Sequence, residues 1–563
     1  MRRGQEVSAH GSWVSRDSLG EWGVALDSHT HDFVGGQRAT REHSSMTTRP
    51  ENGVRPLPEA RRGGDWLWSA VIGLFAATIM AVPIPAGNEP IYMPLLQKRA
   101  DPTYLSTDWT FGSGFAEHAV FDFVFAPLVN LVGLEPVAWA GRLLSWVIIA
   151  RLVIAIGRRL GAPPWTAAIA VGVYLGIRQS MGVGAESIFS LFEAKSVAWP
   201  LLLGAILAAM DRRIELAAVL AGLTFAFHSA IGLWGGGALV LAMLISSETR
   251  RQTFRWLPAT ILIGLIGAIP VVTGLLDSSM GAGNAEFLVL TRLPHHLDPF
   301  SFGQRGPLIL AIMLTFNLGW AYRHRSEFVP RLLGVIQSSL AVVMVLGVIA
   351  RMAGWYEFLL LRPFRVLPVL VPLLFLLTVA GMLVRGFTAP RRPLLADKGT
   401  AVLLGIGVIG LLSIAVLWNP VPRWINDARA NLNAWQAPPT DLELAFDWLS
   451  SDTDPSAVVA SPPWEDRMFY LSERAQFVSW GAVTYDRVQD WRDRLERSMT
   501  DIAPLYGDAD LEEALARYEE VPYDAWLEAA QIHGLTHLLT TAEYETTPLH
   551  SVGDWHVYDI AAG

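Results

Sequence analysis

About eleven long blocks of apolar residues constrain what this chain can fold into. Each block approaches the roughly 20 residues that an α-helix needs to cross a bilayer. Of the 563 residues, 52% are apolar and 17% are charged, against about 25% charged in a typical soluble protein. The sequence therefore predicts an α-helical polytopic membrane protein and excludes a disordered chain. The blocks lie at residues 66–85, 137–157, 164–177, 196–210, 214–231, 233–247, 256–276, 306–322, 332–350, 366–385 and 400–418.

Basic residues predict the orientation of these helices. If the N-terminus lies in the cytoplasm, every strongly basic short connection falls on the cytoplasmic side, as the positive-inside rule requires. A further apolar stretch at 120–132 contains Asp122, and counting it as a span would reverse every later connection. We therefore expect it to form an interfacial helix. The basic connections lie at residues 158–159, 211–213, 248–255, 322–331 and 385–398.

The chain divides by charge into a basic membrane part and an acidic tail. Residues 436–563 hold 25 acidic and 7 basic side chains, a net charge of −18, whereas the remaining residues carry +9. An acidic segment sits poorly beside anionic lipid, which favours an aqueous, extracytoplasmic domain at 436–563. We expect a disordered cytoplasmic N-terminus at 1–64, with Met46 as an alternative start. A transmembrane domain at 65–419 would include a first external loop with interfacial helices at 86–136.

The pattern of the tail predicts a small α/β domain with a parallel or mixed sheet. No glycine-rich phosphate loop follows a predicted strand, and nothing indicates nucleic-acid binding. The chain has no cysteine, which excludes disulfides, thiolate catalysis and cysteine metal sites. Strands are expected at 457–461, 476–480, 536–540 and 555–559, and helices at 441–449, 485–497 and 511–518.

The first external loop carries candidate catalytic carboxylates. Glu89 follows the first span directly, with Tyr92 nearby, and Asp101 and Asp108 come later in the loop. A half-desolvated carboxylate at the headgroup boundary can act as a general base, or it can hold a divalent cation, Mg²⁺ or Mn²⁺, that bridges a phosphate. Alternatively, Glu89 only ends a helix in water and Asp101 only begins a turn.

Arg362 and Arg365 lie between two late spans on the same predicted face. Arginine at membrane level is costly and is often functional. Two guanidinium groups at this spacing are suited to clamp a lipid-linked phosphate. The alternative is that both side chains reach past the apolar region to lipid headgroups.

Two further groups are candidates for the same face. Glu193, Lys195 and His228, with Glu186, are predicted to form a buried polar cluster near the site, or to be paired for structural reasons. The segment from Arg292 to Asp298 includes His295 and His296 and favours a mobile lid, helped by Gly281 and Gly283, over a metal site.

These features resemble the GT-C superfamily of integral-membrane glycosyltransferases over residues 66–560. The resemblance implies a sugar donor linked to polyprenyl phosphate and inverting transfer on the non-cytoplasmic face. Glu89 matches the first-loop acid that serves as base or metal contact, and Arg362 or Arg365 matches the arginine that meets the donor phosphate. The usual adjacent acids, or Asp-x-Asp, are replaced by Asn88-Glu89-Pro90. The motifs are Glu89, Asp101-Pro102 with Asp108-Trp109, Phe192-Glu193-Ala194-Lys195, His228 with Gly232-Leu233-Trp234, and Arg362-Pro363-Phe364-Arg365.

Three functions remain open from the sequence. The first is a multi-pass glycosyltransferase of a bacterial inner membrane that takes a glycan or protein acceptor, with Glu89 or Asp108 as base and the two arginines on the leaving phosphate. The second is a non-catalytic binder or translocator of a lipid-linked glycan, which the missing second acid favours. The third is a secondary transporter, for which the sequence shows no inverted repeat.

Overall fold

The computed structural model describes residues 62–111, 118–177, 182–184, 186–277, 282–388, 398–483, 487–502 and 508–561. Most of the predicted N-terminal region at 1–64, the alternative start at Met46 and the lid residue Gly281 lie outside these residues. The description below concerns the compact unit that begins at residue 56.

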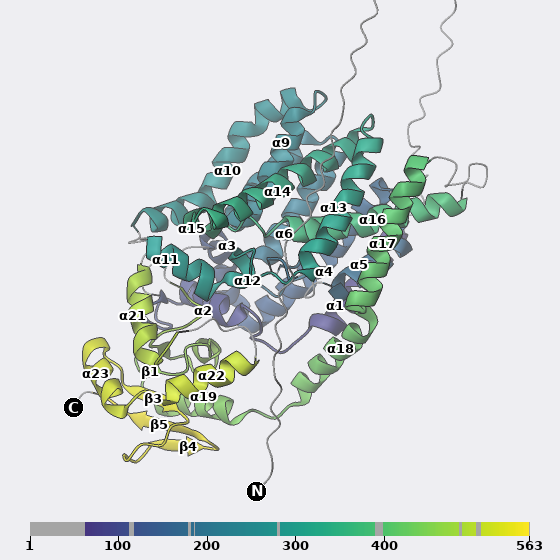
Figure 1. The fold of residues 1–563 in the computed structure, drawn as a ribbon. Helices are drawn as coiled ribbons and strands as arrows, with labels where there is room; N and C mark the ends of the chain where they lie inside the picture. The colour runs from purple at the N-terminus through teal and green to yellow at the C-terminus, as the bar shows by residue number, and fades with distance from the viewer. Residues whose placement is uncertain are drawn as a thin grey trace, which may run out of the picture. The chain divides into compact units, whose positions relative to one another are not determined.

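A helix occupies each of the eleven apolar blocks, as predicted (Figure 1). By length and composition, five helices among the described residues can cross a membrane on their own, namely α4, α10, α14, α16 and α17. Most of the others are shorter apolar helices of 17 residues or fewer. The eleven are α1 (Arg62–Met80), α4 (Leu134–Arg159), α5 (Pro164–Ile177), α6 (Ala194–Met210), α7 (Ile214–Phe227), α9 (Gly237–Ile245), α10 (Arg250–Asp277), α13 (Arg305–Arg323), α14 (Phe328–Met352), α16 (Leu367–Thr388) and α17 (Lys398–Trp418).

Short helices fill the connections between the apolar ones. Helix α3 covers the stretch at 120–132 that the sequence predicts to be interfacial, and the loop predicted at 86–136 also contains α2. Helix α18 leads from α17 to the acidic tail and packs along α1 and α5. The short elements are α2 (Glu89–Ala100), α3 (Ala119–Val132), α8 (Ser229–Ile231), the π-helix η2 (Gly232–Gly236), α11 (Ala282–Phe287), the π-helix η3 (Leu288–Arg292), α12 (Pro294–Leu297), α15 (Tyr356–Leu360) and α18 (Pro420–Gln436).

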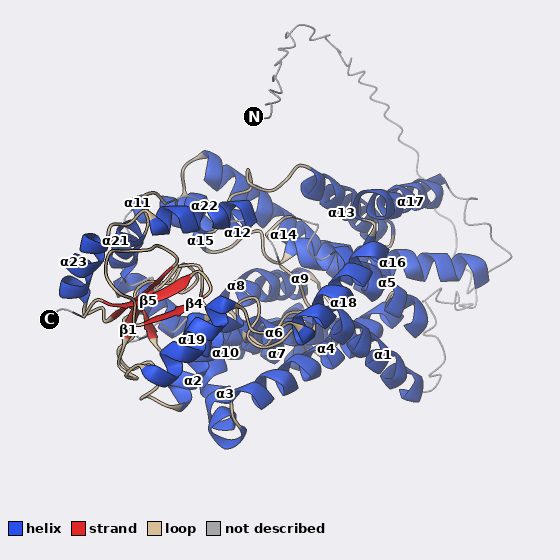
Figure 2. Cartoon of the chain, turned by 90° about the horizontal axis from the view of Figure 1, so that it is seen from below, coloured by secondary structure: helices blue, strands red, loops and turns tan. Residues whose placement is uncertain are grey.

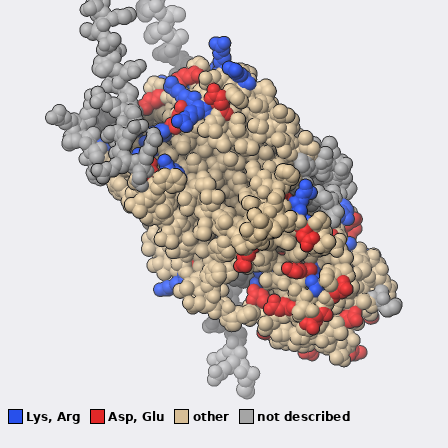
Figure 3. All heavy atoms as spheres, turned by 180° about the vertical axis from the view of Figure 1, so that it is seen from behind, with Lys and Arg blue, Asp and Glu red and all other residues tan. Residues whose placement is uncertain are grey.

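The surface of the helical part fits a bilayer. Figure 3 shows a face on which a broad band carries almost no charged side chains, while basic and acidic groups gather at its two ends. Large apolar side chains of α10, including Leu262 and Ile266, are about 60% exposed or more. Large exposed apolar surface of this kind is typical of a region that contacts lipid. The structure is thus that of a helical membrane protein, in agreement with the predicted fold class.

The tail folds as the predicted α/β domain around a five-stranded mixed sheet of order β2-β1-β3-β5-β4 (Figure 2). Strand β1 runs parallel to β2 and β3, and β5 runs antiparallel to β3 and β4. Alternate strand residues face opposite sides, so that Leu538 packs with α21 and α23 whereas Leu539 packs with α19. The elements are α19 (Asp441–Asp452), β1 (Val458–Ala460), α20 (Met468–Leu471), β2 (Ala475–Gln476), α21 (Val488–Ser498), α22 (Asp508–Glu519), α23 (Tyr523–His533), β3 (His537–Thr540), β4 (His550–Val552) and β5 (Trp555–Asp559).

Candidate functional site

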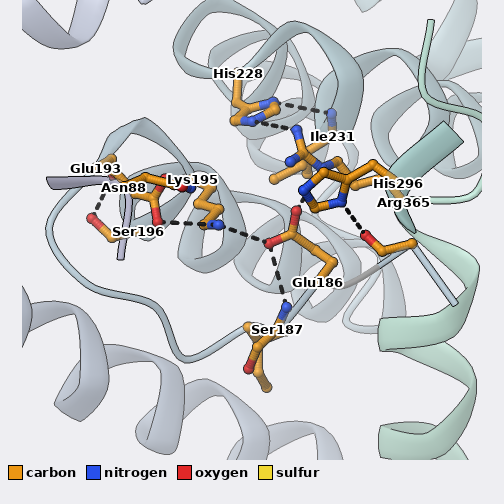
Figure 4. A network of polar contacts seen from close by, with 12 residues as sticks. Asn88, Glu186, Ser187, Glu193, Lys195, Ser196, His228, Ile231, His296 and Arg365 are labelled. Atoms are coloured by element: carbon orange, nitrogen blue, oxygen red, sulfur yellow. Dashed lines mark hydrogen bonds and ion pairs between the residues drawn. The ribbon is translucent and has the colours of Figure 1, made fainter. Parts of the chain in front are cut away.

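A buried network of polar side chains lies inside the helical part, and we call it the Glu186 cluster (Figure 4). The Nζ of Lys195 lies 3.4 Å from Oε1 of Glu186 and 3.1 Å from Oε1 of Glu193. The other oxygen of Glu186 lies 2.5 Å from Nε of Arg365. Arg365 in turn places Nη1 3.3 Å from Nε2 of His228. The cluster joins four of the residues that the sequence singled out, Glu193, Lys195, His228 and Arg365, through the carboxylate of Glu186. Its members are Asn88, Glu186, Glu193, Lys195, His228 and Arg365.

Local backbone structure brings these side chains together from distant segments. Glu193 and Lys195 stand at the first turn of α6, and His228 occupies the break between α7 and α8. Arg365 follows a tight turn between α15 and α16, in which Arg362 has a left-handed φ of 58°. Gly184 supports this turn, because a Cβ at that position would lie 2.6 Å from the carbonyl oxygen of Phe364.

Opposite charges hold the loop carboxylate of the cluster in its ionised form. Burial alone would raise the pKa of Glu186, but the charges of Arg365 and Lys195 outweigh burial and hold the pKa below its ordinary value. Burial raises the pKa of Glu193, although Lys195 opposes the effect. Glu193 is therefore the stronger base of the two carboxylates.

Both ring nitrogens of His228 face hydrogen-bond donors. Its Nδ1 lies 3.4 Å from the backbone N–H of Ile231, and its Nε2 faces the guanidinium of Arg365. Both neighbours are donors, whereas a neutral imidazole offers one acceptor and one N–H. One ring nitrogen therefore directs a hydrogen at another donor. An anionic oxygen beside this pair of nitrogens would accept hydrogens from both.

Glu89 is placed beside the cluster but is bound to other groups. Its carboxylate forms an ion pair with Arg142, with Nε of the arginine 2.7 Å from Oε1, and both side chains have zero exposure. It also accepts hydrogen bonds from the backbone N–H groups of Phe192 at 2.9 Å and Ala86 at 3.1 Å. These contacts fill the lone-pair directions of a carboxylate. The role of Glu89 as a base stays a prediction, but this geometry favours an anchor between α2, α4 and the start of α6.

Asp108, the second predicted base, lies where the loop at 86–136 contacts the acidic domain. It accepts hydrogen bonds from the backbone N–H of Thr110, Phe111 and Gln476, and it is buried. Trp109 donates to the carbonyl of Phe477 beside it. No contact in the described residues joins Asp108 to the Glu186 cluster. This geometry favours docking of the acidic domain, and the catalytic role stays a prediction.

The other residues predicted around the site lie outside the cluster. Asp101 accepts hydrogen bonds from the N–H and hydroxyl of Thr103, as expected for a turn. Tyr92 packs edge-on against His118, whose ring centre lies 5.3 Å from that of His228. Arg362 is half-buried, and its charge acts on the nearby His296.

The predicted lid segment links the site to the acidic domain. Nδ1 of His296 lies 2.8 Å from the carbonyl of Gly184, and burial together with the charge of Arg365 holds the pKa of His296 well below its usual range. At the other end of the segment, Nη2 of Arg292 donates to the carbonyl of Gly481 at 2.9 Å. Asp298 pairs with Arg351 at 3.0 Å. The segment thus contacts both parts of the protein.

A divalent cation does not fit the residues that the structure describes. They contain no group of three or more His, Asp or Glu side chains placed to hold one. At the Glu186 cluster, the ammonium of Lys195 occupies the position between two carboxylates where a metal ion would bind. We therefore assign no chemical step to a metal.

Sequence reasoning missed Arg142 and His118. Arg142 lies within an apolar block, where a charged side chain demands a buried partner, and this cost was a usable signal. His118 ends a polar stretch before α3 and carried no comparable signal.

Neither a protein-family model nor a curated protein matches the chain. Solved structures similar to it include an Archaeoglobus fulgidus oligosaccharyltransferase tethered with an acceptor peptide, with a TM-score of 0.46, 12% identity, and coverage of 85% of this chain and 69% of that chain. Another is ArnT from Cupriavidus metallidurans bound to undecaprenyl phosphate, with a TM-score of 0.46, 12% identity, and coverage of 89% and 99%. A third is the archaeal oligosaccharyltransferase AglB from Archaeoglobus fulgidus in complex with an inhibitory peptide and a dolichol-phosphate, with a TM-score of 0.46, 10% identity, and coverage of 85% and 69%. These are GT-C glycosyltransferases, the superfamily that the sequence motifs resemble. Because the TM-scores lie below 0.5 and the identities are 12% or lower, nothing about the activity of this chain follows from them.

Proposed function

We propose that this protein transfers a sugar from a polyprenyl-phosphate carrier to an acceptor hydroxyl or amide on the non-cytoplasmic face of the membrane. The observation that supports the proposal is that both ring nitrogens of His228 face donors, the guanidinium of Arg365 and the N–H of Ile231, so that one ring nitrogen lacks a matching partner. Two buried donors that face each other are stabilised when an anionic oxygen beside them accepts from both, because an unmade buried hydrogen bond is costly. A phosphate oxygen is such an acceptor.

The charges around this position suit a phosphodiester. Glu186 and Glu193 balance Lys195 and Arg365 in the cluster, and Arg362 adds a positive charge nearby. Glu186 also fixes the guanidinium of Arg365 before any ligand binds. A preorganised cation stabilises the charge that develops on a leaving phosphate in the transition state.

Glu193 is our candidate for the general base. The acceptor would lose its proton to the Glu193 carboxylate while its oxygen or nitrogen bonds to the anomeric carbon. The bond from that carbon to the phosphate oxygen breaks, and polyprenyl phosphate leaves. Its negative charge is stabilised by the guanidinium groups of Arg365 and Arg362. Attack opposite to the leaving group inverts the anomeric centre. Glu89, with its oxygens engaged by Arg142 and two backbone N–H groups, would hold the first loop in place.

The experiment measures binding of radiolabelled undecaprenyl phosphate to the purified full-length protein. We expect Arg365→Ala to weaken binding at least tenfold, the scale of a lost charge-assisted hydrogen bond. Arg305→Ala is the matched control, because Arg305 begins α13 as an exposed arginine and should leave binding unchanged. If both variants lose the same binding affinity, the effect is only a general attraction between arginines and lipid headgroups, and the specific site is refuted. Unchanged binding in Arg365→Ala would also refute the phosphate site.

A second candidate function is binding or translocation of a lipid-linked glycan without catalysis. The full engagement of Glu89 and the amide of Asn88 beside it favour this alternative, because the first-loop acid is then not free to take a proton. Transfer of labelled sugar from polyprenyl-phosphate donors in membranes separates the two. Turnover that Glu193→Gln abolishes supports the enzyme, whereas binding of many donors without turnover supports the binder.

A further inference from the structure

A π-helix begins four residues after His228, at the end of the short helix α8. Element η2 (Gly232–Gly236) joins α8 to α9 and adds an extra residue to the turn. It presses closely on α7, since a Cβ at Gly232 would lie 2.1 Å from the Cα of Phe225. Only glycine permits this approach. π-Helical turns are frequent at functional sites, and this one lies next to a member of the Glu186 cluster.

The π-helix directs Trp234 toward the turn that carries the arginines. The indole N–H of Trp234 donates to the carbonyl oxygen of Leu361 at 2.6 Å, across 127 positions of sequence. Its ring also meets Phe358 of α15 edge-on, with 6.0 Å between ring centres. Trp234 therefore holds the residue immediately before Arg362 by a hydrogen bond and by packing of the preceding helix.

The held turn has a strained backbone. Arg362 has a φ of 58°, a left-handed conformation that a residue with a β-carbon adopts only when its surroundings enforce it. The N–H of Arg362 donates to Leu359 at 2.8 Å and the N–H of Arg365 donates to Arg362 at 3.3 Å. This reversal returns Arg365 to Glu186 and His228.

We propose that Trp234 is a positioning residue of the phosphate site. Its hydrogen bond to Leu361 maintains the left-handed turn at Arg362 and so keeps Arg365 in the Glu186 cluster. The inference deepens the proposed function and rests on it for the ligand, but the positioning itself concerns only the protein. The competing explanation is that Trp234 belongs to the aromatic belt at the membrane interface.

The test combines two readouts on Trp234→Phe, which keeps a ring but loses the N–H. The first is binding of undecaprenyl phosphate to the full-length protein, which we expect to weaken about fivefold, the scale of one hydrogen bond. The second is hydrogen–deuterium exchange at residues 361–366 without ligand, which we expect to quicken. Trp355→Phe is the matched control, because Trp355 is 66% exposed at the opposite, N-terminal end of α15 and should change neither readout.

A rescue variant separates positioning from contact with the ligand. Arg362→Gly removes the cost of the left-handed φ, because glycine adopts it without strain. Arg362→Gly alone should weaken undecaprenyl phosphate binding, because it also removes a charge that we place on the phosphate, so the double variant is compared with Arg362→Gly and not with the wild type. Relative to Arg362→Gly, the added Trp234→Phe should change binding less than twofold. If Trp234→Phe alone does not fold, the comparison of Arg362→Gly with the double variant still tests the positioning role.

Three results overturn the positioning role: an equal fivefold loss in both backgrounds, unchanged exchange at 361–366 in Trp234→Phe, or matching effects of Trp355→Phe. If the wild type does not bind undecaprenyl phosphate, the proposed function fails, and the exchange readout still decides the role of Trp234.

Discussion

Replacement of Glu89 by glutamine separates an anchor from a catalyst. In the structure, Glu89 and Arg142 form an ion pair with zero exposure on both sides. Glutamine keeps the shape of the side chain and one acceptor oxygen, but it removes the negative charge that balances the buried guanidinium of Arg142. The carbonyl of Val82 and the ring of Trp139, which also contact this guanidinium, carry no compensating charge. Breaking a buried ion pair on one side typically costs about 3–5 kcal/mol. We therefore expect Glu89→Gln to destabilise the protein by about that amount.

Glu193→Gln is the matched control for this loss. Lys195, the partner of Glu193, retains Glu186 at 3.4 Å when Glu193 is neutralised. The stability cost of Glu193→Gln should therefore be clearly smaller than that of Glu89→Gln. The double variant Glu89→Gln, Arg142→Met removes both charges and should recover much of the lost stability, because no unpaired charge remains.

The assay is thermal unfolding of the purified protein in detergent, read beside transfer of labelled sugar in membranes. If Glu89 is an anchor, Glu89→Gln lowers the melting temperature strongly. Glu193→Gln should leave the melting temperature nearly unchanged but abolish sugar transfer. A Glu89→Gln protein with the melting temperature of the wild type and no transfer would refute this reasoning. It would restore Glu89 as the base that the sequence predicted.

Three further outcomes are expected. Burial raises the pKa of Asp108 from 3.8 to about 6, so the folded state retains a proton that the unfolded state releases. Thermal stability should therefore fall as pH rises from roughly 4 to 6, and Asp108→Asn should flatten this slope. Gly184→Ala should weaken undecaprenyl phosphate binding more than Gly182→Ala, because both glycines have positive φ but only the Cβ at 184 meets a backbone oxygen of the α15–α16 turn. The chain lacks cysteine, so an impermeant maleimide should label Ser551→Cys in right-side-out vesicles and Ser326→Cys only after lysis; the reverse pattern would invert the predicted orientation.

Secondary structure was predictable where a single periodic signal dominates. Each apolar block became a helix because backbone groups in lipid must bond within their own segment. The strand at 555–559 was predicted with the bounds of β5. Strand β4 (His550–Val552) and helix α23 (Tyr523–His533) were missed. Strand β4 is three residues long and half-exposed, and it depends on pairing with β5, which sequence does not display.

The candidate site was predictable in its residue types but not in its pairings. Arg365, Glu193, Lys195 and His228 were all singled out, because charged groups near membrane level are costly and rarely incidental. Their connection through Glu186 depends on the turn at 361–366 and on the loop before α6, and neither has a periodic signal. The sequence predicts a base, a metal contact or a helix end at Glu89, and it does not reveal the ion pair because Arg142 lies 53 residues away within an apolar block.

The adjacency of Asn88 and Glu89 connects the anchor to the proposed catalytic group. Two neighbouring residues at the start of α2 bind two neighbouring residues before α6. Glu89 accepts the N–H of Phe192 at 2.9 Å, and the amide of Asn88 donates to Glu193 at 3.2 Å. The anchor therefore fixes the backbone on which Glu193 stands, while the neutral amide orients the Glu193 carboxylate without adding a second negative charge. A second acid at position 88 would repel Glu193 and raise its pKa further. Asparagine at this position is thus compatible with catalysis when Glu193, rather than Glu89, takes the proton.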